Sequence, residues 1–430
     1  MRRMGLWLLI AMQAVAWTQA ASAETNWEIQ AVDADGLGTH PKVGADASDP
    51  SNRVVVEGIA LNAPHELLDP NEMWQVFVQG EGPDMGGTAA WSGMFFQSVY
   101  WPEYPDDIQP GDRVRITGFV ADNLGKANVN ERHSADPNMN FDVEVLQQGV
   151  GMPAPTLISS ISDCNYFDQT RAGGGEKYQA RWVRMNDVYV ESGIWDNHEH
   201  VYVSQGEGVN FPLHLSGQGD FDSVPGPVGD FDVVGIFDQE AGLGAWPPPD
   251  PPYITDYRIW VKSSAGIITA SLMSSDPPPD GTLPKTQNNV IRLVFDEPIR
   301  FVGSGDPLVI VELDGGADVI GAFVCHVDPN DPTGSTLVAS EDGVRLANQT
   351  WYNVSPSTSL AVRAFSLDVC TLAGDANGSG RVTTADYSTV KSHLGQYTDG
   401  RCDLDGSGRV TTADYGVVKA SLGVRIPAKP

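Results

Sequence analysis

A ten-residue segment occurs twice near the C-terminus, and this repeat constrains the chain more than any other feature. Gly378 to Tyr387 and Gly406 to Tyr415 are both Gly-Ser-Gly-Arg-Val-Thr-Thr-Ala-Asp-Tyr, and the second copy begins 28 residues after the first. Chance does not produce an identity of that length in a chain of 430 residues. The C-terminal region therefore contains two copies of one small structural unit.

Each copy lies in a frame of twelve residues that places oxygen-bearing side chains at alternate positions. Calcium takes about six to eight oxygen ligands, and such a loop provides them from positions 1, 3, 5, 9 and 12 and from the backbone carbonyl of position 7. Gly380 and Gly408 stand at position 6, where the chain turns too sharply for a side chain. The predicted ligands are Asp375, Asn377, Ser379, Arg381, Thr383 and Asp386 in the first loop, and Asp403, Asp405, Ser407, Arg409, Thr411 and Asp414 in the second. The pattern predicts two sites for the cofactor Ca²⁺.

The two loops differ from the EF-hand loop and from each other. Position 12 is Asp instead of Glu, and position 5 is Ser. The first loop has two carboxylates, whereas the second has three, because Asp405 stands where the first loop has Asn377. Since affinity follows the charge of the ligands, we expect the second loop to bind calcium more tightly.

The segment after each loop has the apolar spacing of a helix. Helices are expected over residues 386–394 and 414–422. Each helix is expected to have one apolar face. The residues on these faces are Tyr387, Val390 and Leu394 in the first helix and Tyr415, Val418 and Leu422 in the second.

Two loop–helix halves with Asp at position 12, and no helix before either loop, resemble a dockerin domain over about residues 372–425. Both copies also carry an apolar residue at position 8 and Lys at position 17. The resemblance implies calcium-dependent binding to a cohesin-like module, with either half able to face the partner. It assigns partner binding to Thr384, Ala385, Lys391, Thr412, Ala413 and Lys419. The alternative is a calcium-bound terminal cap that docks on the neighbouring domain.

The chain before this region is organised as short β-strands. Gly (46) and Pro (30) are abundant and charged residues make up only 19%, a balance that favours strands and turns over long helices. Strands are expected at residues 53–61, 74–78, 91–98, 111–118 and 141–146. The pattern recurs: residues 204–208 echo 78–82, residues 229–235 echo the strand at 111–118, and residues 257–261 echo the stretch from 141. The economical interpretation is two copies of one five-stranded unit.

These units resemble OB-fold barrels, such as those attached to secreted bacterial nucleases, over about residues 45–267. OB-folds bind oligonucleotides or oligosaccharides on an open face. The formal charge of −30 repels phosphates, which disfavours nucleic acid and leaves glycan as the candidate ligand. The aromatic residues that could serve as stacking platforms, or else form the core, are Trp74, Trp91, Trp101, Trp182 and Trp195.

A third kind of β domain follows the linker-like residues 275–281. Short strands are expected at residues 290–295, 308–312, 336–339 and 360–365. This spacing predicts a β-sandwich. The stretch resembles bacterial immunoglobulin-like domains, which usually serve as spacers.

The N-terminus has the pattern of a secretory signal peptide. Arg2 and Arg3 precede an apolar run from Gly5 to Trp17, which is followed by Ala21-Ser22-Ala23. Cleavage is expected after Ala23, with an uncleaved anchor as the alternative. No later stretch is apolar enough to span a membrane, so we expect a secreted protein.

Export makes disulfides possible. Four cysteines allow three pairings. The pair Cys370–Cys402 is favoured because it brackets the C-terminal repeat, and Cys325–Cys370 is the rival pairing. Cys164 is the remaining cysteine.

The sequence favours a non-catalytic protein. No G-x-S-x-G, HExxH or Gly-rich phosphate loop occurs, and no carboxylate pair is marked out for glycoside hydrolysis. His198 and His200 form the only histidine cluster and could share one face of a strand as metal ligands, but no third ligand is identifiable.

The predicted fold class is a mainly β multidomain chain, with two OB-like barrels, a β-sandwich and a small α-helical EF-hand-like dockerin. The expected segments are a signal peptide (1–23), an N-terminal segment (24–44), OB-like domains (45–152 and 153–267), an Ig-like sandwich (268–371) and the dockerin (372–425). The predicted function is calcium-dependent docking of a secreted, non-catalytic protein onto a cohesin-like partner or surface assembly. The alternative is a component of an extracellular polysaccharide-degrading system that binds glycan or hydrolyses O-glycosyl bonds.

Overall fold

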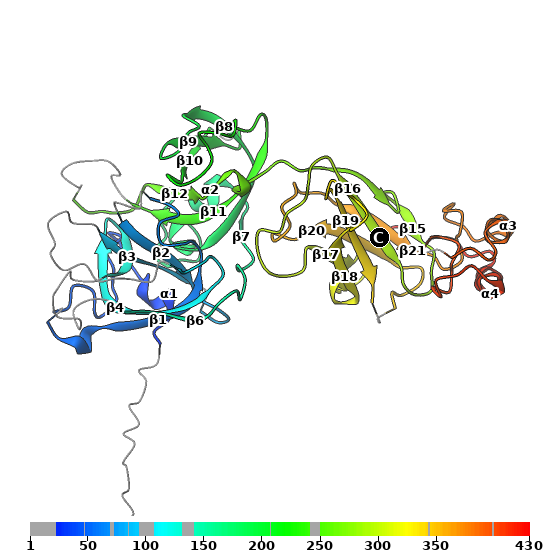
Figure 1. The fold of residues 1–430 in the computed structure, drawn as a ribbon, viewed down its shortest axis with the longest axis horizontal. Helices are drawn as coiled ribbons and strands as arrows, with labels where there is room; N and C mark the ends of the chain where they lie inside the picture. The colour runs from blue at the N-terminus through cyan, green and yellow to red at the C-terminus, as the bar shows by residue number, and fades with distance from the viewer. Residues whose placement is uncertain are drawn as a thin grey trace, which may run out of the picture.

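The computed structural model confirms the predicted fold class, with several β-sheets, two of them barrel-like, and short helices near the C-terminus (Figure 1). It describes residues 23–46, 48–68, 73–84, 86–93, 107–130, 142–206, 208–240, 250–342, 345–397 and 400–430. The predicted signal peptide lies almost wholly outside these residues and stays a prediction. In the described part of the chain, no helix has the length and apolar character needed to cross a membrane.

The first barrel is a sheet in the order β1-β2-β3-β5-β4 that closes because β4 pairs back onto β1. Its strands are β1 (Val54–Ala60), β2 (Met73–Gln79), β3 (Gly87–Gly93), β4 (Arg113–Asn123) and β5 (Lys126–Asn130), and β6 (Asp142–Gln147) adds to β4. Buried and half-buried residues alternate along the first part of β1 and of β4, because successive side chains of a strand point to opposite faces of the sheet. The short helix α1 (Asn26–Ile29) places Ile29 in the same core, so the N-terminal segment packs as part of this barrel.

The second barrel has the same connectivity, in the order β8-β9-β10-β12-β11 with β11 pairing back onto β8. Its strands are β8 (Trp182–Gly193), β9 (His200–Ser204), β10 (Asn210–Leu215), β11 (Phe231–Gln239) and β12 (Tyr257–Val261); β7 (Thr156–Ile158), β13 (Ile267–Ile268) and the helix α2 (Ile161–Cys164) flank them. In both barrels the third and fifth strands pair in parallel. The two sheets are therefore copies of one topology.

One predicted correspondence between the copies is wrong. Residues 257–261 form β12, whose counterpart in the first barrel is β5 and not the predicted strand at 141–146, which lies in the added strand β6. The strand β5 was not predicted because Lys126-Ala-Asn-Val-Asn130, although it alternates polar and apolar residues, is short and rich in Lys, Asn and Ala, which are depleted in strands. Lys126 and Asn128 are nevertheless buried, and Lys126 bonds to Asp238 of the second barrel. The strand predicted at 91–98 begins earlier, at Gly87, and its residues 94–98 lie outside the described residues.

A buried ion cluster joins the two barrels. Lys126 Nζ on β5 lies 3.0 Å from Asp238 Oδ1 on β11, and Arg258 Nη2 lies 2.8 Å from Asp238 Oδ2. Trp260 Nε1 also donates to Asp238, at 3.0 Å. Burial raises the pKa of Asp238, but the charges of Lys126 and Arg258 more than offset this and lower it to about 2. The carboxylate is thus ionised and shared between two cations from different barrels.

The sandwich consists of two four-stranded sheets that enclose one apolar core. One sheet has the order β14 (Leu272–Asp276), β16 (Val290–Phe295), β19 (Thr336–Glu341) and β18 (Phe323–Val327); the other has the order β15 (Gly281–Leu283), β21 (Leu367–Thr371), β20 (Trp351–Pro356) and β17 (Leu308–Glu312). The helices α3 (Thr384–Ser392) and α4 (Thr412–Ser421) follow at the far end of the molecule, and the last residues return towards the sandwich (Figure 1).

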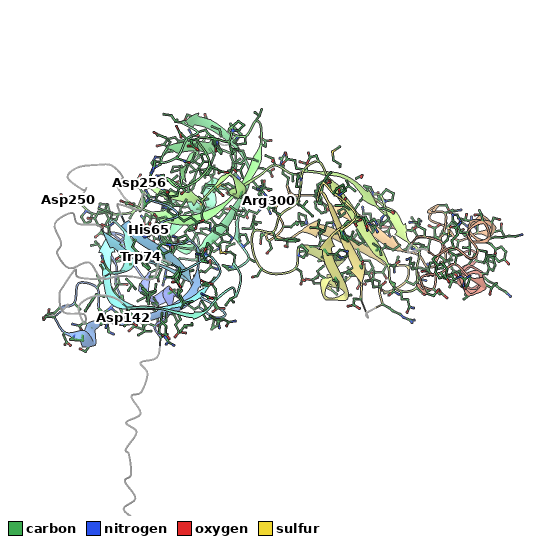
Figure 2. The ribbon with its side chains drawn as sticks, in the orientation of Figure 1. His65, Trp74, Asp142, Asp250, Asp256 and Arg300 are labelled. Carbon is green, nitrogen blue, oxygen red and sulfur yellow. The ribbon has the colours of Figure 1, made fainter. Side chains whose placement is uncertain are left out.

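The strand predicted at 360–365 is wrong. Leu360 makes one isolated bridge and the following residues form no strand, although Leu360 and Val362 are buried in the sandwich core. Arg184 on β8 explains why these backbone groups do not join a sheet. Its guanidinium donates to the carbonyl oxygen of Leu360 at 2.7 Å and to that of Val362. Arg300 lies at the same junction of barrels and sandwich and donates to the Ile267 carbonyl at 3.0 Å (Figure 2).

The cysteine pairings expected from the sequence are also wrong. All four cysteines lie in the described part of the chain, and each is a free thiol. Cys370 is on β21 of the sandwich and Cys402 belongs to the separate core around α3 and α4, while Cys325 lies on β18 in the opposite sheet from Cys370. Burial raises the pKa of the Cys370 thiol to about 12 and thereby keeps it protonated.

We predict that Asp238→Asn weakens the barrel pair by about 3 kcal/mol or more, because it removes the counter-charge of buried Lys126 and leaves buried Arg258 with Glu240 alone. Since folding lowers the pKa of Asp238, the stabilisation is present above the ordinary Asp pKa of about 4 and is lost as the pH falls towards about 2. Urea unfolding followed by tryptophan fluorescence at pH 7 and at pH 3 measures this.

The matched control is Asp142→Asn. Asp142 pairs with Arg53 at the surface, where its side chain is 71% exposed, and the substitution is expected to leave the free energy of unfolding nearly unchanged. Equal losses for the two variants at pH 7 would contradict the account of the buried cluster.

Candidate metal centre

The two C-terminal helices begin where their loops end, through a hydrogen-bonded cap. Thr383 Oγ1 accepts from the amide of Ala385, and Asp386 accepts from the amide of Thr383 at 2.8 Å. Thr411 and Asp414 form the same capping box on α4. These caps start the helices two residues earlier than the apolar spacing predicted, and each stabilises its helix by about 1 kcal/mol.

The predicted apolar faces are only partly buried. Val390 and Val418 are fully buried in one core with the loop residues Val382 and Val410. Tyr387, Leu394 and Leu422 are exposed instead. Leu394 and Leu422 lie beyond the ends of their helices, and the rings of Tyr387 and Tyr415 stack on each other with centroids 4.3 Å apart.

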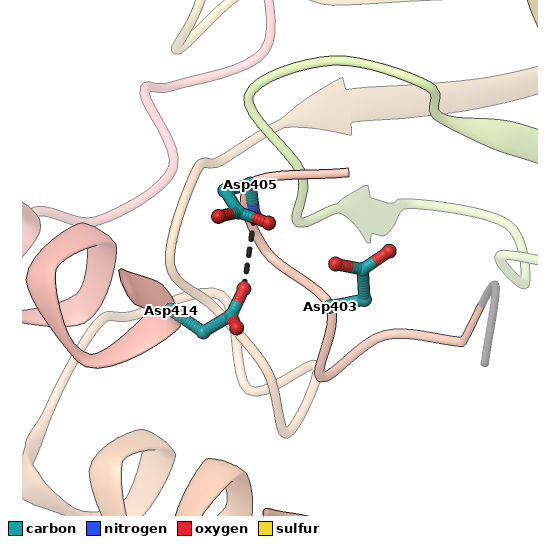
Figure 3. Close-up of side chains that lie close together, drawn as sticks. All are labelled: Asp403, Asp405 and Asp414. Carbon is teal, nitrogen blue, oxygen red and sulfur yellow. Dashed lines mark hydrogen bonds between the residues drawn. The ribbon is translucent and has the colours of Figure 1, made fainter. Parts of the chain in front are cut away.

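The second loop brings three carboxylates together. One oxygen each from Asp403, Asp405 and Asp414 lies within 4.8 Å of the others (Figure 3). Backbone amides fix their orientation, since Asp403 accepts from Ser407 and Gly408 and Asp414 accepts from Asp405 at 3.0 Å. Among the described residues, this is the one group of three acidic, histidine or cysteine side chains whose ligand atoms are so close. Such a cluster of negative charge fits a cation with hard oxygen ligands.

The first loop has the same backbone pattern with one carboxylate fewer. Asp375 accepts from the amides of Ser379 at 3.0 Å and Gly380 at 2.9 Å, as Asp403 does from the equivalent residues. Asp386 accepts from the amide of Asn377 at 3.0 Å, as Asp414 does in the second loop. Both loops are therefore closed in the same way, and they differ in the charge of their third position.

The residues predicted to bind a partner lie on the two helices and are all exposed. Thr384, Ala385 and Lys391 lie on α3, and Thr412, Ala413 and Lys419 lie at the matching places on α4. Each threonine–alanine pair stands in the first turn of its helix, next to the calcium loop, and each lysine stands in the last turn. The two halves therefore present the same side chains.

The histidine cluster does not gain a third ligand. His200 stacks on His214 with ring centroids 4.0 Å apart, and His214 stacks on Trp260 at 3.8 Å. Burial, reinforced by the charge of Arg258, lowers the pKa of His214 to about 2 and keeps the ring neutral. In the part of the chain that the structure describes, no group of three metal-ligating side chains includes His198 or His200.

The tryptophans predicted as stacking platforms behave mainly as core residues. Trp74 and Trp182 are buried, and Trp195 packs against Phe221 with ring centroids 5.4 Å apart. Trp101 and the side chain of Trp91 lie outside the described residues. Trp74 and Trp182 therefore expose little of their rings, and Trp195 is half-buried.

No pattern in the sequence predicts the contacts that the loops make with the sandwich. Thr282 on β15 donates its hydroxyl to Asp375 Oδ2 at 2.7 Å, and Gln287 donates to the Asp405 carbonyl at 2.9 Å. These residues lie about ninety residues or more before the loops and belong to no motif. Only the tertiary fold brings them together.

The geometry defines a module of two equivalent acidic loops, each followed by a capped helix. A comparison with protein families gives the same result, because residues 373–423 match the model described as Dockerin type I domain. No curated protein matches the chain. The suspected dockerin is thus confirmed at the C-terminus. Dockerin domains bind calcium, and their presence indicates a module that docks onto cohesins in cellulosome-type assemblies.

We predict that Asp403→Ala removes the tighter of two calcium-binding events and that Asp375→Ala removes the weaker one. The reason is that the second loop has three carboxylates and the first has two. Calorimetric titration of each full-length variant with calcium measures the affinity that remains. Equal residual affinities in the two variants would contradict the predicted difference between the loops.

Proposed function

We propose that this protein is a secreted, non-catalytic component of an extracellular assembly, attached to a cohesin-like partner through its dockerin. The observation that carries the proposal is the pair of equivalent loop–helix units with their partner-facing residues exposed. In this proposal the dockerin attaches the preceding β domains to the assembly.

The proposed sites hold two Ca²⁺ ions, one in each loop, through the twelve residues that the sequence predicts as ligands. Support comes from hydrogen bonds that occur at equivalent positions of both loops. The amide of position 3 donates to the Asp at position 12, and the amide of position 5 donates to the Asp at position 1. Bound calcium supplies positive charge to carboxylates that would otherwise repel one another. Asp386 and Asp414 each accept hydrogen bonds from an amide within the loop and from the N-cap residue of the following helix.

The proposed docking surface is the first turn of each helix. A hydroxyl and a methyl group, from Thr384 and Ala385 on α3, allow close packing against a flat partner surface. The same pair on α4, Thr412 and Ala413, offers the partner a second, equivalent approach. Lys391 and Lys419 add one positive charge to each half.

The OB-fold and immunoglobulin-like assignments of the β domains belong to the proposal. The barrel order, with a first strand that pairs with both the second and the fourth, supports an OB-type barrel. Two four-stranded sheets around one core support an immunoglobulin-like sandwich. Since these folds serve many functions, they add no activity by themselves.

A second candidate function is glycan binding, and one cavity favours it. A cavity of about 460 Å³ lies where the barrels meet the sandwich, and its lining combines Glu66, Lys262 and Ser304 with Trp182 and the half-exposed Phe301. Polar groups beside aromatic carbon suit a sugar.

If a glycan binds there, Phe301→Ala should abolish the retardation of the full chain in polysaccharide-containing native gels, whereas the exposed control Met273→Ala should not. Release of reducing sugar by the parent chain would contradict the non-catalytic proposal.

The proposed docking is tested with an immobilised panel of cohesin modules and the full chain, in calcium and in chelator. We expect calcium-dependent binding that a double variant, Ala385→Asp with Ala413→Asp, weakens at least about ten-fold, because each partner approach then buries an unpaired charge. Either single variant should bind nearly as well as the parent, since the other half stays intact. Asp in the first turn of a helix is itself favourable, so both helices should still form.

The control is Val228→Asp, at a residue of the second barrel whose exposed fraction is 97%. It introduces the same charge far from the helices and should leave binding unchanged. The proposal fails if no cohesin binds the parent chain in calcium, or if the double variant binds as well as the parent.

A further inference from the structure

One segment of the sandwich lies against both calcium loops. It runs from Thr282 on β15 to Asn288, just before β16 begins at Val290. Hydrogen bonds join this segment to the first loop, to the second loop and to the residue that leads into the second loop. We refer to residues 282–288 as the supporting segment.

The first contact reaches a calcium ligand directly. The Thr282 hydroxyl donates to Asp375 Oδ2 at 2.7 Å, and the exposed fractions of these residues are 2% and 0%. The amide of Gly380 donates to the same oxygen, while Asp375 Oδ1 faces the amide of Ser379. The two donors on Oδ2 fix the rotation of the carboxylate, and they do so from two different domains.

The second contact is a bridge made by Arg401. Its Nη1 donates to the Thr282 carbonyl at 2.6 Å, and its Nη2 donates to Thr282 Oγ1 at 2.7 Å and to the Asp375 carbonyl at 3.0 Å. Arg401 precedes the first ligand of the second loop, Asp403, by two residues. One guanidinium therefore connects the first loop, the start of the second loop and the sandwich.

The third contact lies along the second loop. The Thr286 amide donates to the Leu404 carbonyl at 2.9 Å, Gln287 Nε2 to the Asp405 carbonyl at 2.9 Å, and Asn288 Nδ2 to the Gly406 carbonyl at 2.7 Å. Gly406 has φ of +69°, and a Cβ there would lie 2.5 Å from the Gln287 carbonyl oxygen. Three successive carbonyls of the loop are thus held by three successive residues of the sandwich.

We infer that the supporting segment is part of the calcium-binding machinery, so that calcium binding by the dockerin and its attachment to the sandwich are one coupled equilibrium. The inference rests on the proposed binding of calcium to both loops. Residues that orient metal ligands from outside the coordination shell commonly change metal affinity by about 10- to 100-fold. Because such coupling is reciprocal, calcium must strengthen the contacts with the sandwich by the same factor with which those contacts strengthen calcium binding.

The coupling has a physical cause in the loops themselves. Without a cation, three carboxylates within 4.8 Å repel one another and favour opening of the second loop. Opening would displace the carbonyls of Leu404, Asp405 and Gly406 from the supporting segment. The contacts with the sandwich and the closed loop therefore form and break together.

The affinity test uses Thr282→Val in the full-length chain. Valine has the shape of threonine without the hydroxyl, so we expect one of the two calcium-binding events to weaken about ten-fold. Thr282→Ser keeps the hydroxyl and should restore the affinity. Thr269→Val makes the same change where the hydroxyl bonds Glu297, away from the dockerin, and should have no effect. Parent-like calcium affinity in Thr282→Val would overturn the inference.

Hydrogen exchange at the Thr286 amide tests the reciprocal effect, because this amide donates across the interface to Leu404. We expect chelation of calcium to speed its exchange at least about ten-fold in the full chain, while the amide of Ala339, on a sandwich strand that is paired on both sides, keeps its rate. If the chain binds calcium but exchange at Thr286 does not respond, the coupling is disproved and the proposed calcium sites stand. If the chain binds no calcium, the proposed sites fail and the inference fails with them.

Discussion

The carboxylate at the last position of each loop is the interaction on which the C-terminal module depends. Asp386 accepts from the amide of Asn377 within the loop and from that of Thr383 at the helix start, and Asp414 does the same in the second copy. One buried charge therefore closes a loop and caps a helix. At the proposed sites, loss of calcium would leave this charge and its neighbours uncompensated, so that the helices, the loops and the metal would form a single structural unit.

This unit is not isolated from the domains before it. The barrels share the buried charge of Asp238, the second barrel reaches the sandwich through Arg184, and the sandwich reaches the calcium loops through Thr282. Each junction uses polar side chains that are buried and paired. The two barrels lie together at one end of the molecule, and the sandwich separates them from the dockerin at the other end (Figure 1). Such an arrangement suits a protein that attaches at one end and presents its β domains at the other.

The success of sequence-based prediction varied with the kind of interaction. The dockerin was predictable because the spacing of its loop residues is a local property, β1 and β16 because they are rich in β-branched residues, and β4 because polar and apolar residues alternate along its first half. The strand β5 was missed because its Lys and Asn residues are typical of a loop, whereas Lys126 is buried through its ion pair with Asp238 of the second barrel. The apolar residues 360–362 were taken for a strand, although Arg184 satisfies their carbonyls. No local pattern could reveal Thr282, because its partner Asp375 is 93 residues away in the sequence.

The central claim is that two calcium ions organise the C-terminal module of this chain. Calorimetric titration of the full-length, chelator-stripped protein with calcium tests it most directly. The account predicts two calcium ions per chain, together with a gain of helical circular dichroism as they bind. A chain that takes up no calcium, or that takes up a single ion with no change in helix content, would contradict it.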